Sequence, residues 1–332
     1  MNPLIRLVDT LVRLKGYQVR RDNGLGLGGM RMVRRALDDG QAGEAVAALE
    51  DRPRPAAPPA GDLDALHVCL RTCLRENRNV NPKPRLTGGS LEDLTLRCTL
   101  SLVRSLNHAA RHGGGRVSLR VLDDRSDAAP LARLRQVLAE ADAAVPVEVV
   151  TTAEPGQGPS LHQQFDWARQ QDGLTYFVED DWLHETDGVL AMWDFYRDMA
   201  ARCGSHLVIA PQEHGSLYMD HPPSYIVLGR DRRWRTIHNA THTLFTHGRV
   251  VREQWECFEN TRFVGTRKRA LGSERQTTNR LFDRMPAFSP LAPAAVHLQY
   301  DEILPPFFDW RPLWERNDVS HRVAADNSAP AG

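Results

Sequence analysis

Between residues 65 and 180 the sequence alternates between short apolar runs and longer segments with helical periodicity. The short runs are rich in β-branched and aromatic residues, whereas the longer segments repeat apolar residues every three or four positions. Strands that alternate with helices form a mainly parallel sheet, because each helix carries the chain back to the start of the next strand. This alternation predicts an α/β fold with helices on both faces of a central sheet.

The expected strands cover residues 66–70, 117–122, 145–150 and the run that ends at residue 178. The helix after the first strand has a capping signal, Ser90 followed by Asp93. Pro146 favours an edge position for the third strand, because proline has no N–H to donate to a neighbouring strand. Ser160 is expected to cap the helix that follows.

The fourth strand ends in three consecutive acids, Glu179, Asp180 and Asp181. Adjacent carboxylates repel one another, so a folded protein keeps them together mainly where a cation binds. In parallel α/β sheets, ligands bind beyond the carboxyl ends of the strands. The sequence therefore predicts a cation site at this edge, and carboxylate oxygens suit a hard cation better than imidazole or thiolate would.

Two other strands also end in polar residues. Arg71 and Thr72 follow the first strand, and the run Asp123-Asp124-Arg125-Ser126-Asp127 follows the second. Taken alone, the second run can be a turn in which Ser126 or Asp127 caps the next helix. Its place after an apolar strand, upstream of the acidic triplet, favours a binding site instead.

The order of these features resembles the glycosyltransferases of the GT-A fold, particularly family 2. In that family a second strand ends in Asp-Asp-x-Ser-x-Asp and a later strand ends in Asp-x-Asp. Residues 123–127 are similar to the first motif, with Arg125 where glycine is common, and Glu179 replaces the first acid of the second motif. The resemblance covers about residues 65–190. It implies a Rossmann-like GT-A domain that moves a sugar from a nucleotide-diphosphate donor to a hydroxyl of a glycan or lipid-linked acceptor, with inversion.

The resemblance also implies roles for the strand-end residues. The nucleotide-sugar site would include Arg71, Thr72 and Asp123 in the base pocket, with Asp124, Glu179 and Asp180 beside them. Asp181 would bind Mg²⁺ or Mn²⁺, because breaking the sugar–phosphate bond expels a diphosphate whose charge a divalent cation stabilises. His297 would be a further metal ligand, although a histidine on an apolar strand is more often a core residue.

An inverting transfer needs a base that removes the proton of the acceptor hydroxyl. In the related enzymes this base is an acid that opens a helix, and Glu274 in the run Gly272-Ser273-Glu274 has that position. A first-turn carboxylate is also favoured by the helix dipole without any catalytic role. Glu213 is the competing candidate for the base.

The sequence is also compatible with other functions. A sugar-phosphate nucleotidyltransferase would share the sheet and the acids, but its first strand is usually followed by a glycine-rich loop, which residues 70–75 lack. A non-catalytic relative would bind a sugar nucleotide or a glycan without turnover. His238, His242 and His247 suggest a zinc hydrolase only if they share a helix. They can also line an acceptor pocket together with Trp234.

Bulk composition limits the partners. Lys and Arg number 42, as do Asp and Glu, so no net charge favours nucleic acid. Five scattered cysteines suit a reducing compartment better than a disulfide framework. No segment approaches the ~20 apolar residues of a membrane span. We therefore expect a cytoplasmic protein.

The sequence divides into four parts. Residues 1–52 predict a helical extension, whose basic amphipathic segment 1–21 can lie on the inner face of a membrane. A proline-rich linker at 53–61 follows. The catalytic domain is expected at 62–316, and the small, polar tail at 317–332 is expected to be disordered.

Overall fold

The computed structural model describes residues 59–75, 86–213, 224–262 and 272–320. Its first half consists of strands that alternate with helices, as the sequence predicts. In chain order these elements are β1 (Asp62–Thr72), α3 (Leu91–His112), β2 (Arg116–Asp123), α4 (Ala128–Leu138), β3 (Val147–Thr151), α5 (Gln157–Ala168) and β4 (Gly173–Glu179).

The second half has shorter elements. They are β5 (Trp182–His184), α6 (Gly188–Cys203), β6 (Val208–Ile209), β7 (Ile226–Leu228), β8 (Arg233–Thr236), β9 (Phe245–His247), α8 (Gly248–Glu253), β10 (Ala287–Pro290), β11 (Ala295–His297) and α10 (Arg311–Arg316). Short 3₁₀ helices connect several of them, including Glu274–Gln276 and Thr278–Asp283.

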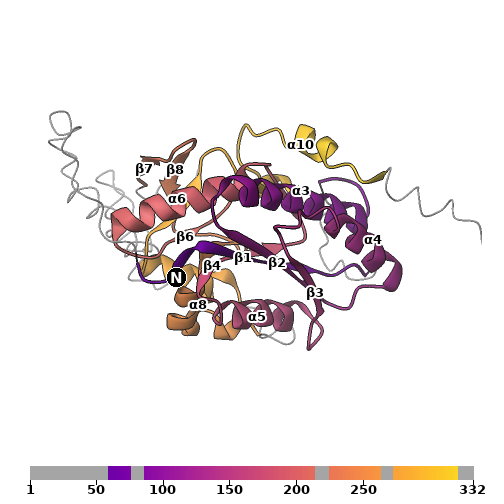
Figure 1. Ribbon diagram of the computed structural model, residues 1–332, viewed down its shortest axis with the longest axis horizontal. Coiled ribbons are helices and arrows are strands. Elements are labelled where there is room, and N and C mark those ends of the chain that lie inside the picture. Colours follow the sequence, from indigo (N-terminus) through magenta and orange to yellow (C-terminus); the bar gives the residue numbers. More distant parts are fainter. Residues whose placement is uncertain (1–58, 76–85, 214–223, 263–271, 321–332) are drawn as a thin grey trace, which may run out of the picture.

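One sheet runs through the molecule, with the strand order β3-β2-β1-β4-β9-β6-β10-β8-β7. Strand β9 is antiparallel to both of its neighbours, and so is β8, so the other seven strands of the nine share one direction. Helices α3 and α6 cover one face of this sheet, whereas α5 and α8 cover the other (Figure 1). The predicted α/β class with a mainly parallel sheet is confirmed.

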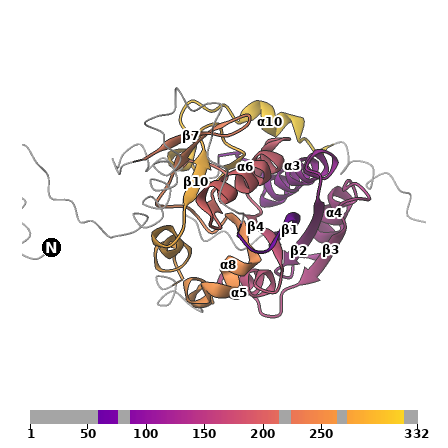
Figure 2. The same ribbon diagram turned by 60° about the vertical axis from the view of Figure 1, so that its left-hand side comes forward.

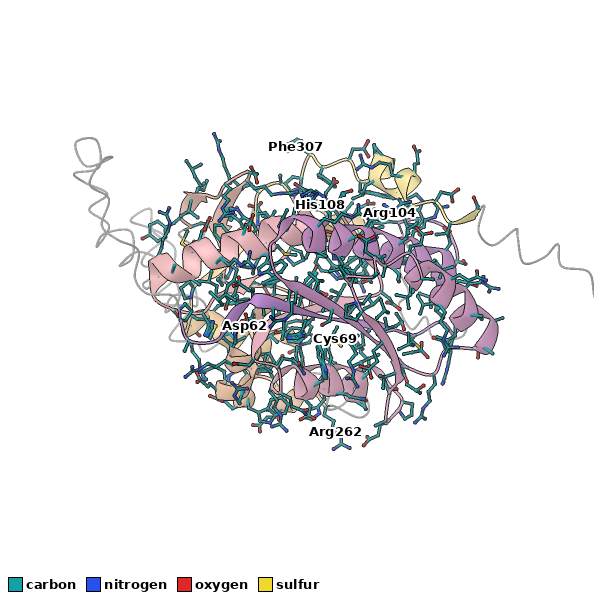
Figure 3. The ribbon with its side chains drawn as sticks, viewed as in Figure 1. Asp62, Cys69, Arg104, His108, Arg262 and Phe307 are labelled. Carbon is teal, nitrogen blue, oxygen red and sulfur yellow. The ribbon has the colours of Figure 1, made fainter. Side chains whose placement is uncertain are left out.

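Strand β4 is buried on both faces, which explains its unbroken apolar run. Tyr176 and Val178 pack in the core under α3 and α6, and Phe177 packs in a second core under α5 and α8. The turned view in Figure 2 shows the two helical layers on either side of the strands. Figure 3 likewise places Cys69 of β1 within the sheet layer, with Arg104 and His108 on α3 at one side.

Two of the local predictions are confirmed and one is wrong. Ser90 caps α3 by accepting a hydrogen bond from the Asp93 N–H at 3.0 Å, and β3 is an edge strand. Ser160 does not cap α5, which begins at Gln157 after Gly156. Gly156 has a φ of 113°, a left-handed turn that glycine adopts readily, and this turn starts the helix one turn earlier.

Several sequence-based expectations fall outside the described residues. These include the helical extension 1–52, its membrane-facing segment 1–21 and most of the linker 53–61. Within residues 317–332, which the sequence predicts to be a disordered tail, Asn317 and Val319 are buried. The packed part of the chain therefore reaches at least residue 319. All five cysteines are free thiols. None of the helices in the described ranges is both long and apolar enough to cross a membrane.

Candidate functional site

The carboxyl ends of β1, β2 and β4 bring the predicted polar residues to one edge of the sheet. Because the three strands are parallel neighbours, their last residues lie side by side. Arg71 pairs in register with Glu179, and Thr72 pairs with Asp123. The topology therefore assembles side chains that lie 51 and 108 residues apart in the sequence.

Arg71 binds Glu179, the first acid of the triplet. One guanidinium nitrogen contacts the Glu179 carboxylate, and the other donates to Ser160 Oγ at 3.0 Å. Ser160 lies within the first turns of α5, so Arg71 ties β1, β4 and α5 together. The Arg71 charge therefore offsets that of Glu179, the first of the three acids.

Asp123 is fully engaged inside the protein. One carboxylate oxygen accepts from Thr72 Oγ1 at 3.1 Å and from Ser126 Oγ, and the other accepts from the Ser126 N–H at 2.9 Å. The side chain is only 1% exposed. Asp127 stands at the N-cap of α4, but its carboxylate accepts no cap hydrogen bond from a described N–H. Ser126 thus closes the turn. The contact of Asp123 with the base of a nucleotide remains a prediction.

Asp124 holds the neighbouring loop. Its carboxylate accepts from Thr152 Oγ1 at 3.3 Å and from the Gly156 N–H at 2.9 Å. These bonds join the ends of β2 and β3 to the start of α5. Because Asp124 is buried, these bonds fix the loop that leads into α5.

Asp180 lies on the opposite side of β4, toward α3. Its Oδ2 accepts from the Cys73 N–H at 3.2 Å and from Thr95 Oγ1 at 3.4 Å. Burial raises the pKa of Asp180 to about 7, and the nearby charge of Asp181 adds to this effect. A positive charge beside Asp180 would counter both effects, so this carboxyl suits a ligand that carries a cation.

Asp181 and His297 meet across a small second sheet formed by β5 and β11. His297 Nε2 lies 3.1 Å from Asp181 Oδ2, and the imidazole stacks on Trp182 with ring centres 4.8 Å apart. Burial alone would lower the pKa of His297, but Asp181 and more distant carboxylates raise it above its ordinary value. The backbone N–H of His297 donates to Gln212 at 2.9 Å, which fixes the strand.

Within the described residues, no group of three His, Cys, Asp or Glu side chains forms a ready-made metal cage. Mg²⁺ ordinarily binds through one or two carboxylates together with substrate phosphates and water rather than in a protein cage. Asp181 supplies one carboxylate of that kind, and the His297 imidazole lies beside it. The residues therefore fit a divalent cation that a diphosphate ligand brings with it.

The two candidate bases have different surroundings. Glu274 opens a 3₁₀ helix with its side chain 41% exposed, and its charge contributes to the raised pKa of His297. Glu213 is 1% exposed and lies 3.7 Å from Arg235 on β8. A carboxylate removes a proton from a substrate only if the substrate can reach it, so Glu274 is the better placed of the two.

The histidine run does not form a zinc site. His242 lies close to Glu274, whereas His247 lies in β9 opposite Leu174, at the other end of β4. Trp234 is buried and stacks on Phe195 with ring centres 4.0 Å apart, so it packs in the core. Sequence patterns gave no sign that Gln212 accepts from the His297 N–H or that Thr95 donates to Asp180, because each pair is separated by 85 residues.

Comparisons with known proteins concern the fold. No protein-family model and no curated protein matches the sequence. Solved structures with a similar fold include S. aureus TarS (11% identity, TM-score 0.40, 68% of this chain and 36% of that one). This chain thus spans little more than a third of that TarS chain.

Two further structures are similar. One is the mannosyltransferase PcManGT from Pyrobaculum calidifontis in complex with GDP-Man and Mn²⁺ (11% identity, TM-score 0.38, 91% of this chain and 76% of that one). The other is UDP-glucose pyrophosphorylase from Acinetobacter baumannii (8% identity, TM-score 0.44, 76% and 92%). Because these TM-scores are low, we assign chemistry to this chain from its own residues alone.

Proposed function

We propose that this protein is a metal-dependent glycosyltransferase that moves a sugar from a nucleotide diphosphate to a hydroxyl acceptor with inversion. One observation carries the proposal: Arg71, the Asp180–Asp181 pair and His297 meet at the carboxyl edge of the sheet, with Glu274 close by. A guanidinium, a partial cation site and an accessible carboxylate are the groups that such a transfer requires.

Each group has a defined task in this proposal. Asp181, with His297 beside it, would hold a divalent cation, which would supply positive charge against the departing diphosphate. The polar residues after β1 and β2 bind the nucleotide. Glu274 takes the proton of the acceptor hydroxyl while its oxygen attacks the anomeric carbon of the sugar. The acceptor is a glycan or a lipid-linked saccharide.

The test is incubation with Mn²⁺ and a panel of nucleotide sugars, monitoring binding by calorimetry and slow donor hydrolysis by nucleotide release. We expect at least one donor to bind, and Asp181→Asn to lower its turnover by about 100-fold or more. Asp142→Asn is the matched control, because this carboxylate pairs with the exposed Arg111 away from the site. If no donor binds, or if Asp181→Asn behaves like wild type, the proposal is wrong.

A nucleotidyltransferase is distinguished by its product. The same protein would be incubated with sugar 1-phosphates and nucleoside triphosphates, and pyrophosphate release would be measured. We expect none, because residues 70–75 contain no glycine to cradle a triphosphate. Rapid pyrophosphate release would assign the protein to that class instead.

A further inference from the structure

His242 is the buried neighbour of the candidate base. It lies between β8 and β9, is 6% exposed, and has its Nδ1 3.5 Å from Glu274 Oε1. Its other nitrogen, Nε2, lies 3.1 Å from the hydroxyl of Thr277. The ring is held edge-on to Phe165, with ring centres 6.2 Å apart. The imidazole is therefore fixed between one carboxylate and one hydroxyl.

The position of the ring proton follows from the hydrogen bonds of Thr277. A threonine hydroxyl has one proton to donate. Thr277 donates that proton to the Ser273 carbonyl at 2.8 Å, so its oxygen can only accept from His242. Nε2 must therefore carry the ring proton. A neutral ring has no second proton, so Nδ1 presents a bare lone pair to Glu274.

The charges around His242 keep the ring neutral until a proton reaches it. Burial lowers the pKa of His242 to about 4, and Glu179 opposes this effect while Arg71 adds to it. Glu274 is the other charged group that faces the ring. Two hydrogen-bond acceptors thus face each other at 3.5 Å, an arrangement that becomes favourable once a proton lies between them.

We propose that His242 is a positioning residue that accepts, through Nδ1, the proton that Glu274 removes from the acceptor hydroxyl. This inference rests on the proposed glycosyltransferase function. The acceptor O–H bond breaks and its proton passes to Glu274 and then to Nδ1, which forms an imidazolium. The electron pair of that bond forms the new bond to the anomeric carbon, while the old sugar–phosphate bond breaks and its electron pair leaves with the diphosphate. The imidazolium returns its proton to solvent after the product departs.

The first test locates the ring proton and requires no substrate. Long-range ¹⁵N–¹H correlation spectra would be recorded on the full chain, with the His242→Gln variant used to assign the ring. We expect the wild-type proton on Nε2. In Thr277→Val the acceptor of that proton is lost, so the proton is expected to move to Nδ1 and point at Glu274. Thr277→Ser keeps the hydroxyl and should keep the wild-type pattern. A wild-type proton on Nδ1, or no change in Thr277→Val, overturns the proposal.

The second test uses turnover of a donor and acceptor. We expect Thr277→Val and His242→Phe to lower kcat by about 10-fold with little change in KM, and to shift the acidic limb of the pH–rate profile. Thr277→Ser should restore both. Unchanged kcat and profile in the two variants would contradict the relay.

The failures of the two proposals are distinguishable. If no nucleotide sugar binds but the ring proton lies on Nε2 and moves in Thr277→Val, the proposed function and the relay that rests on it are wrong, whereas the hydrogen-bond arrangement of His242 stands. If Glu274→Gln abolishes turnover while Thr277→Val does not alter it, the function stands and the role of His242 is wrong.

Discussion

Two acidic pairs stand at strand ends in the same sheet edge, yet their surroundings differ. Asp123 and Asp124, after β2, are buried and accept hydrogen bonds from the protein's own hydroxyl and N–H groups. Asp180 and Asp181, after β4, remain partly exposed, and the pKa of Asp180 is raised to about 7. The first pair holds the turn after β2 and the loop before α5, whereas in the second pair Asp180 keeps a proton up to about pH 7. The same residue type at equivalent strand ends is thus buried in one place and partly exposed in the other.

The largest effect on stability is expected from Asp123→Ala. It leaves the Thr72 hydroxyl and two donors of Ser126 without their buried acceptor, which should lower the free energy of unfolding by about 3 kcal/mol. Urea denaturation followed by circular dichroism measures this. Asp127→Ala is the control and should cost less than about 1 kcal/mol, because no cap bond is lost. Equal losses in both variants would contradict the comparison.

The next effect is a change in pH dependence in Asp180→Asn. With a folded pKa of about 7 against an ordinary value of 3.8, Asp180 keeps a proton between pH 4 and 7 that the unfolded chain has lost. Its contribution to stability therefore falls as the pH rises through this window. Without divalent cations, Asp180→Asn should gain stability relative to wild type as the pH rises from 4 to 7.

Buried histidines make the protein less stable at low pH, which is opposite to the effect of Asp180. The quantity to measure is therefore the difference in stability between wild type and Asp180→Asn at each pH. Burial lowers the pKa of His184 to about 3, so the unfolded chain binds a proton below pH 6.5 while the folded protein does not. The contribution of His184 to the free energy of unfolding is therefore lost on acidification, equally in wild type and in Asp180→Asn. A difference between the two proteins that does not vary with pH would show that Asp180 ionises normally.

The smallest effect is expected from Thr72→Val. It removes one of the hydrogen bonds to Asp123 and leaves the contacts from Ser126, so the loss should be about 1 kcal/mol. Thermal unfolding of Thr72→Val and Thr72→Ser measures it, and serine should retain most of the stability. A loss as large as that of Asp123→Ala would mean that Thr72 alone holds the turn.

Sequence patterns predicted the features that depend on near neighbours. The alternation of elements, the capping of α3 by Ser90 and the edge position of β3 all follow from residues within a few positions of one another. The convergence of Arg71, Asp123 and the acidic triplet followed because parallel strands end at one edge.

The remaining features depend on distant contacts and left no local signal. The start of α5 is set by Gly156, whose N–H donates to Asp124 across 32 residues. The pairing of Gln212 with His297 and of His242 with Thr277 joins segments 85 and 35 residues apart. Single-sequence periodicity does not carry such pairings, so from sequence alone a histidine beside a carboxylate cannot be told from a histidine in the core.

The contact between Asp181 and His297 spans 116 residues and depends on β11 pairing with β5. A nascent chain that has been synthesised only through β10 already contains Glu179, Asp180 and Asp181, but it does not yet contain His297. A ligand that bridges these two side chains would hold the last strand of the fold in place. Limited proteolysis or hydrogen exchange should then find β11 and the segment after it most protected when donor and cation are both present.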